Sequence, residues 1–156
     1  MTAPVDTERG FSLELELERD YLQRVNFDTE GLESIQVDEP PPLGSGDGPN
    51  PARLLGAALG GCLGASLLFC LRKSRIDVQG LHTSVDGTIA RNERGRLRVQ
   101  RMRIVLEPLV PAEQHERMGR CLEVFEDFCI VTASVRGGID LEVVVEPRVP
   151  AAAGSL

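Results

Sequence analysis

The sequence predicts an α+β domain, and three patterns support this fold class. The first forty residues contain three short stretches with strand character. Residues 54–71 form a long uncharged run typical of a buried helix, and two further strands, an amphipathic helix and a last strand follow. With 156 residues, 42% of them hydrophobic and 26% charged, the chain has the composition of one globular domain.

Composition also argues against several classes of partner. A net charge of -7, a single Tyr and no Trp make nucleic acid a poor partner, because a phosphate backbone would be repelled and few rings are present for stacking. The two histidines lack a second ligand at metal-site spacing and no CxxC occurs, so we expect no metal and no cofactor. The N-terminus does not resemble a secretory signal, which favours the cytoplasm.

The N-terminal part is predicted to form a three-stranded meander. From Phe11 to Leu17 apolar and polar residues alternate, which is typical of a half-buried strand. A turn near Arg19 and Asp20 leads to a second strand over 22–27, and a turn at 28–31 precedes a third over 34–37. Prolines and glycines then predict a loop up to Pro49.

A long helix is predicted from Pro51 to about Arg75, with Asn50 as its N-cap. Its uncharged run has the length of a membrane span. Because half of that run consists of small, weakly apolar residues, a buried core helix is favoured and no membrane is expected. Gly56, Gly60 and Gly64, four residues apart, predict the close approach of another helix.

The second half continues with a strand over 81–90, a turn at 92–95 and a strand over 97–106. A break in the two-residue period between Val99 and Met102 indicates a bulge. An amphipathic helix from Pro111 to about Phe128, a short turn or helix over 130–135 and a last strand from Ile139 to Val145 follow. The domain is expected to span 11–147, between a flexible N-terminus (1–10) and a flexible tail (148–156).

The central helix predicts a homodimer. A helix that is apolar on all sides needs cover all round, and six strands with one other helix offer limited surface. A partner subunit is the simplest cover.

The four cysteines differ in their settings. Cys62 and Cys70 lie about 12 Å apart along one helix, so any disulfide must join distant segments. Cys70 and Cys121 fall on apolar stripes, where core packing accounts for them. Cys129 lies where one helix ends and another starts, and unpaired backbone N–H groups there are expected to lower the pKa of its thiol.

Two segments resemble a known family. Residues 48–62, GPNPARLLGAALGGC, and residues 129–141, CIVTASVRGGIDL, are similar to the two cysteine motifs of the OsmC/Ohr family, the osmotically inducible and organic hydroperoxide resistance proteins. The resemblance implies the order β-β-β-α-β-β-α-β, with two long helices packed between the sheets of an intertwined homodimer. It also implies active sites at the subunit interface.

The resemblance further implies a thiol-dependent peroxidase that reduces organic hydroperoxides. Cys62 would attack the peroxide and become a sulfenic acid, Cys129 would resolve it as a disulfide, and an external dithiol would reduce that bond. An arginine of the N-terminal hairpin would offset the desolvation of the thiolate. Arg19 is the expected residue, with Arg24 as the alternative, and no cofactor is implied.

Two positions depart from the family pattern. Ala52 stands where peroxidase members carry the glutamate that holds the arginine, although Asp38 or Glu39 of the preceding loop could reach the site. Ile130 replaces a proline that many members have after the second cysteine. The alternative function is therefore a non-catalytic module that binds a hydrophobic small molecule at the dimer interface. Four apolar residues would line either site: Leu59, Leu63, Phe125 and Phe128.

Overall fold

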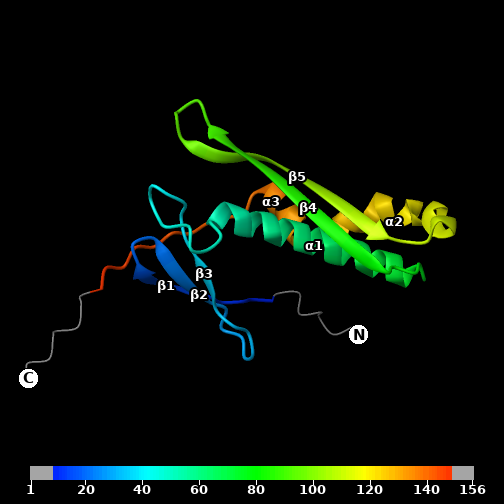
Figure 1. Cartoon of the computed structure of the whole chain (residues 1–156), viewed down its shortest axis with the longest axis horizontal. Helices are drawn as coiled ribbons and strands as arrows, with labels where there is room; N and C mark the ends of the chain where they lie inside the picture. The colour runs from blue at the N-terminus through cyan, green and yellow to red at the C-terminus, as the bar shows by residue number, and fades with distance from the viewer. Residues whose placement is uncertain (1–8, 149–156) are drawn as a thin grey trace, which may run out of the picture.

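A computed structural model describes residues 9–148 and places a long central helix between two antiparallel sheets and a series of short helices (Figure 1). The predicted α+β class is confirmed. A three-stranded sheet lies near one end of the helix, and a two-stranded hairpin crosses it (Figure 1). The short helices pack along the remaining side.

The N-terminal sheet consists of β1 (Glu14–Arg19), β2 (Leu22–Asn26) and β3 (Ile35–Val37), antiparallel in the order β1-β2-β3. The meander is as predicted. The β1–β2 turn places Asp20 in the left-handed region with a φ of 45°, a conformation that Asp tolerates better than most residues.

The sequence predicts that the apolar side of β1 is buried, but in the structure it is exposed. All of its residues are exposed, and Phe11, which precedes the strand, is 92% exposed. Alternation fixes which side chains share a face, but burial also needs a second layer. No element among the described residues covers this face.

The central helix α1 spans Pro51–Lys73 and begins as predicted. The Asn50 side chain accepts a hydrogen bond from the Arg53 N–H at 3.0 Å, and Pro51 occupies the first turn. The helix ends about two residues before the predicted end, and Arg75 follows in a left-handed conformation with a φ of 56°.

The glycine stripe of α1 faces a strand and not the helix that the spacing predicts. The hairpin strands are β4 (Gly80–Arg91) and β5 (Leu97–Leu109). A Cβ on Gly60 would lie 3.0 Å from Val85 Cγ2, and one on Gly64 would lie 3.1 Å from Leu81 Cδ2. The glycines therefore let β4 lie close to α1.

The hairpin itself follows the prediction closely. At its turn, the Asn92 side chain accepts hydrogen bonds from the N–H groups of Arg94 and Arg96, each at 3.0 Å. Thr88 pairs with Arg101 and the next residue with Val99, so Gln100 has no partner in β4. This register shift is the predicted bulge.

The second predicted helix is broken into shorter pieces. Its residues form the 3₁₀ helix η1 (Ala112–Met118), helix α2 (Gly119–Val124) and the 3₁₀ helix η2 (Phe125–Phe128), and a separate helix α3 (Ile130–Gly137) follows. No side chain caps η1 or α2. Gly119 lies in the middle of the predicted helix, where glycine costs about 1 kcal/mol relative to alanine. The predicted range is therefore helical over 112–128, but it alternates between 3₁₀ and α geometry and is not one regular α-helix.

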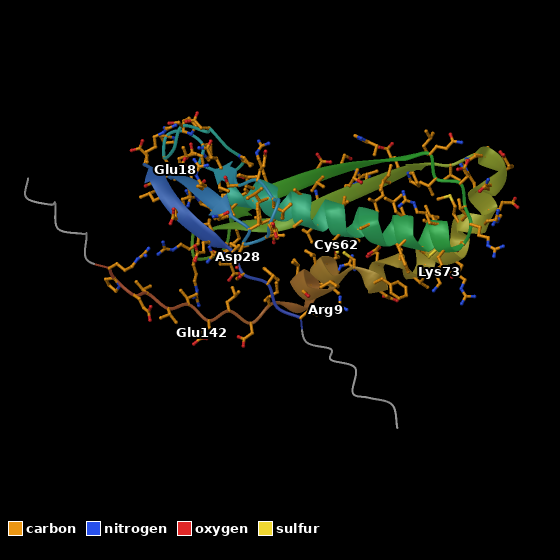
Figure 2. All side chains as sticks on the ribbon, turned by 90° about the horizontal axis from the view of Figure 1, so that it is seen from below. Arg9, Glu18, Asp28, Cys62, Lys73 and Glu142 are labelled. Carbon is orange, nitrogen blue, oxygen red and sulfur yellow. A yellow bond between two sulfur atoms is a disulfide. The ribbon has the colours of Figure 1, made fainter. Side chains whose placement is uncertain are left out.

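The predicted last strand is also absent from the single chain. Residues 139–148 have no regular structure, and the apolar residues of its alternating pattern are exposed: Ile139, Leu141, Val143 and Val145. A strand needs a neighbour for its N–H and C=O groups. The segment that carries Glu142 leaves α3 without joining either sheet (Figure 2). The expected flexible ends lie, apart from Arg9, Gly10 and Arg148, outside the described residues.

One face of α1 stays uncovered. Its buried residues face the hairpin and the short helices, whereas small residues and one aromatic residue are exposed on the other side: Ala57, Ala58, Gly61, Ala65 and Phe69. By length and composition α1 could cross a membrane, with a mean hydropathy of 2.1 over its most apolar window, of which 44% is buried. Partial burial within the fold is what a core helix shows.

Candidate functional site

Cys62 lies midway along α1, beside the buried face of the helix. Its thiol is free and only partly buried. The residue before Cys62 lies on the uncovered face of α1, and the residue after it is buried in the core. Cys62 therefore lies at the border between the buried and the uncovered sides of the helix. Cys62 is therefore the more exposed of the two free cysteines.

Cys129 is the N-cap residue of α3 and is fully buried. Its Sγ lies 3.0 Å from Thr132 Oγ1, and the hydroxyl can donate or accept in that contact. The N–H groups of Val131 and Thr132 also point at this sulfur. The predicted setting of Cys129 at the start of a helix is thus observed.

The two free thiols influence each other's pKa values. Burial raises the pKa of Cys62, and the hydrogen bond that its thiol donates to Cys129 raises it further. Burial also acts to raise the pKa of Cys129. The hydrogen bonds from Cys62, from the Thr132 hydroxyl and from the backbone N–H groups together outweigh burial and leave that pKa lowered. The two thiols therefore titrate as a pair in which the charged form of Cys129 is favoured over that of Cys62.

The N-terminus of α3 faces both sulfurs. Backbone N–H groups of Ile130 and Val131 approach Cys62 and favour its thiolate, and those of Val131 and Thr132 favour the thiolate of Cys129. Such groups carry the partial positive charge of a helix N-terminus. The site can thus hold one thiolate on either sulfur, next to a thiol.

The predicted cation lies elsewhere in the chain. Arg19 Nη2 is 2.6 Å from Asp47 Oδ2, and this carboxylate raises the pKa of Arg19. Arg24 forms an ion pair with Glu18. Among the described residues, no cation is one of the main causes of the shift in the pKa of Cys62.

The separation between Arg19 and Cys62 follows from the helix. Asp47 precedes the N-cap of α1 by three residues, and Cys62 follows that cap by about 18 Å of helix rise. Figure 2 shows Glu18, the neighbour of Arg19, beyond one end of α1 and Cys62 midway along it. The single chain does not bring Arg19 and the thiol pair together.

Asp47, a loop residue, is the acidic partner of Arg19. The neighbouring Asp38 is buried, and its carboxylate accepts hydrogen bonds from the N–H groups of Glu39, Ser45 and Asp47 at 2.8, 3.1 and 3.1 Å. These backbone hydrogen bonds, that from Asp47 the strongest, outweigh burial and lower the pKa of Asp38. Asp38 therefore shapes the loop, and neither it nor Glu39 pairs with Arg19 as the sequence suggested.

The predicted apolar lining is only partly assembled. Leu63 and Phe125 pack in the core cluster that contains Cys129, and Leu59 is buried, whereas Phe128 is 63% exposed. A cavity of about 600 Å³ lies between the first half of α1 and the hairpin, but none of the cysteines lines it. Within residues 9–148 no cluster of three or more His, Cys, Asp or Glu side chains could hold a metal ion.

The structure contains a disulfide that the sequence did not predict. Cys70 of α1 is bonded to Cys121 of α2, with their Cα atoms 5.6 Å apart, so core packing alone does not account for these two residues. A signal for this bond exists in the spacing. Cys62 and Cys70 are eight residues apart, as are Cys121 and Cys129, which fits two contacts between antiparallel segments. Thr132 was also missed, although a hydroxyl residue three positions after a helix start is well placed to contact the N-cap.

Fold and site together define a small α+β protein whose two thiols meet where a short helix starts beside a central helix. Residues 44–144 match the family described as OsmC-like protein, and the chain belongs to this family. The resemblance stated from the two cysteine motifs is confirmed. No curated protein matches the sequence.

Solved structures share the fold at low sequence identity. An OsmC-like protein from Mycoplasma pneumoniae matches with a TM-score of 0.71 and 17% identity, over 84% of this chain and 90% of that chain. An OsmC-like protein of unknown function from Vibrio cholerae matches with a TM-score of 0.69 and 18% identity, over 81% of this chain and 94% of that chain. An organic hydroperoxide resistance protein from Elizabethkingia anophelis matches with a TM-score of 0.64 and 20% identity, over 87% of this chain and 94% of that chain.

Proposed function

We propose that this protein is a thiol-dependent peroxidase that reduces organic hydroperoxides and acts as a homodimer. The observation that carries the proposal is the pair of free thiols, Cys62 and Cys129, at the start of α3, where each affects the pKa of the other. Two neighbouring thiols, one partly exposed and one stabilised as a thiolate, are the parts that a peroxide-reducing dithiol needs.

Cys62 makes the attack because it is the thiol that a peroxide can reach. Cys129 is fully buried, and its thiolate first takes the proton that Cys62 donates to it. The Cys62 thiolate then attacks the distal peroxide oxygen and the O–O bond breaks. The alkoxide that leaves takes the proton from the Cys129 thiol, which gives the alcohol and restores the Cys129 thiolate. Cys62 becomes a sulfenic acid.

Cys129 resolves this intermediate. Its thiolate attacks the Cys62 sulfur, a disulfide forms and hydroxide leaves, which takes up a proton to give water. The two thiols have then supplied the two electrons that the peroxide consumed. An external dithiol returns the electrons by thiol–disulfide exchange and regenerates the thiol pair.

A partner subunit would complete this site. The desolvated Cys62 thiolate needs a cation, and within the described chain none is one of the main causes of the shift in its pKa. Arg19, fixed by Asp47 at the far end of α1, is available to the Cys62 of a second copy. The uncovered face of α1 and the exposed segment 139–145 offer apolar surface for the contact.

Counting thiols tests the activity. When the reduced protein is treated with cumene hydroperoxide, we expect two thiols per chain to disappear and mass mapping to find Cys62 bonded to Cys129. The Cys129→Ser variant should stop at a sulfenic acid on Cys62 that dimedone captures, and Cys62→Ser should leave Cys129 reduced. If both cysteines of the wild-type pair stay reduced, the protein is not a peroxidase, and a non-catalytic binding role is favoured.

A further inference from the structure

A second cysteine pair lies outside the candidate site. Cys70, in the last turn of α1, is bonded to Cys121 of α2 across 51 residues of sequence. This bond lies about 12 Å along α1 from Cys62, too far for direct exchange between the two pairs. The disulfide therefore needs a role of its own.

The disulfide is the main attachment of the segment 112–124, which comprises η1 and α2. Among the residues of this segment only Cys121 is buried. Its other links include hydrogen bonds near the surface, such as those from Arg117 Nη2 to Ser74 O at 3.0 Å and from the Asp77 N–H to Gln114 Oε1 at 2.9 Å. A helix of six residues has little stability of its own. Opening the bond would leave the buried Cys121 and the partly buried Met118 as the apolar side chains that hold the segment against the core.

The two sulfurs of the bond differ in a way that favours its opening from one side. Cys121 is 2% exposed, whereas Cys70 is only partly buried, so a small thiolate reaches the Cys70 sulfur first. Cys121 is then the leaving group. Ser74 Oγ lies 3.3 Å from Cys121 Sγ, and this hydroxyl can donate a hydrogen bond to the thiolate that forms.

From this arrangement we propose that Cys70 and Cys121 form a redox-modification site that small thiols and small disulfides of the glutathione class open and close. In opening, a small thiolate attacks Cys70 and releases the Cys121 thiolate. A second small thiolate attacks the small-molecule sulfur of the mixed disulfide and releases Cys70. Two small thiols give up two electrons and become one small disulfide, while the protein bond becomes two thiols. Closing is the reverse reaction.

The two states differ in how the segment 112–124 is held. When the bond is closed, α2 is tied covalently to α1. When it is open, the segment detaches locally at a much lower cost, because it has few buried contacts. The site does not depend on the peroxidase proposal, since neither Cys62 nor Cys129 takes part.

Equilibration with glutathione tests the reversibility of the bond. The Cys62→Ser/Cys129→Ser variant is brought to equilibrium in a series of mixtures of reduced and oxidised glutathione, and free thiols are alkylated and counted by mass. We expect the bonded fraction to fall from nearly all to nearly none across the series, with the same curve from either starting state. A fraction that stays constant across the series would overturn the proposal. If the double variant does not fold, mass mapping of Cys70 and Cys121 in the wild-type chain gives the same readout.

Two further measurements test the structural consequence and the chemistry. Amide hydrogen exchange in residues 112–124 should be about tenfold faster in the reduced than in the oxidised protein, while the β4–β5 hairpin stays unchanged. Ser74→Ala should slow reduction by a small dithiol about threefold or more, whereas Ser134→Ala, which removes an exposed hydroxyl, should have no effect. Equal exchange in both redox states would overturn the proposed role of the bond.

Discussion

At the scale of single residues, Thr132 is one of the groups that set the charge of Cys129. Its hydroxyl is 3.0 Å from Cys129 Sγ and buried with it. A hydroxyl that donates to a buried thiolate stabilises the charged form. After the hydrogen bond with Cys62, the hydrogen bond with Thr132 is the largest contribution that lowers the pKa of Cys129.

Thr132→Val, which keeps the shape and removes the hydroxyl, should raise the pKa of Cys129. The lost stabilisation of the thiolate is about 1.5 kcal/mol, typical of a hydrogen bond to a charged group. The measurement is a pH titration of thiolate absorbance in a Cys62→Ser background, where Cys129 is the free thiol. Ser134→Ala should leave the titration midpoint unchanged. An unchanged midpoint in Thr132→Val would mean that the backbone N–H groups alone hold the thiolate.

The sequence could predict some of these residues because they lie in continuous motifs. Cys62 and Cys129 each carry a local pattern, and the position of Cys129 at a helix start can be inferred from the sequence around it. Asp47 could not be predicted as the partner of Arg19. It lies between two glycines in a loop, and its place depends on three backbone hydrogen bonds to the buried Asp38. Such a contact is set by the folded loop and leaves no periodic signal.

At the scale of elements, glycines act in two opposite ways. Gly60 lies against Val85, and a Cβ there would be 3.0 Å from Cγ2 of that valine. Gly119 starts α2, is exposed and has nothing within 4 Å of an added Cβ. The first glycine allows a strand to pack on α1, and the second weakens a helix without any packing benefit.

Gly60→Ala should therefore lower the free energy of unfolding by about 1–3 kcal/mol, because the methyl group overpacks the contact between α1 and β4. Gly119→Ala should raise it by up to about 1 kcal/mol through helix propensity. Urea unfolding of both variants and the wild type at one protein concentration measures the two effects. A loss of stability in Gly119→Ala would show that this position has a contact outside the single chain.

Elements with strong local signals were predictable, and those that need distant partners were not. The cap at Asn50 and the bulge at Gln100 can be located from nearby residues. The last strand has the right alternation over 139–145 but no neighbouring strand in its own chain. The second helix has an amphipathic pattern, yet only Cys121 of α2 is buried, so tertiary packing does not enforce one continuous helix.

At the scale of the whole molecule, apolar surface is left uncovered in three places. They are the apolar face of β1, the small-residue face of α1 and the segment 139–145. Together they exceed the scattered apolar exposure that is normal for a monomer. A second copy that covers these surfaces would also give the segment 139–145 a strand to pair with, which accounts for a strand pattern that one chain leaves unused.

If two copies share their sites, Arg19 of one should serve Cys62 of the other. A mixed dimer of one Arg19→Ala chain and one Cys62→Ser chain, isolated with two different affinity tags, tests this arrangement. It contains one site with an intact Cys62 and an intact Arg19 only if the arginine crosses the interface. We expect such mixed dimers to recover about half of the hydroperoxide-reducing rate of the wild type, while each variant alone is nearly inactive. If the mixed dimer is as inactive as its parents, Arg19 and Cys62 of a working site must belong to the same chain. That result would contradict the proposal and would require a single chain to bridge the roughly 18 Å of helix between Cys62 and the end of α1 near Arg19.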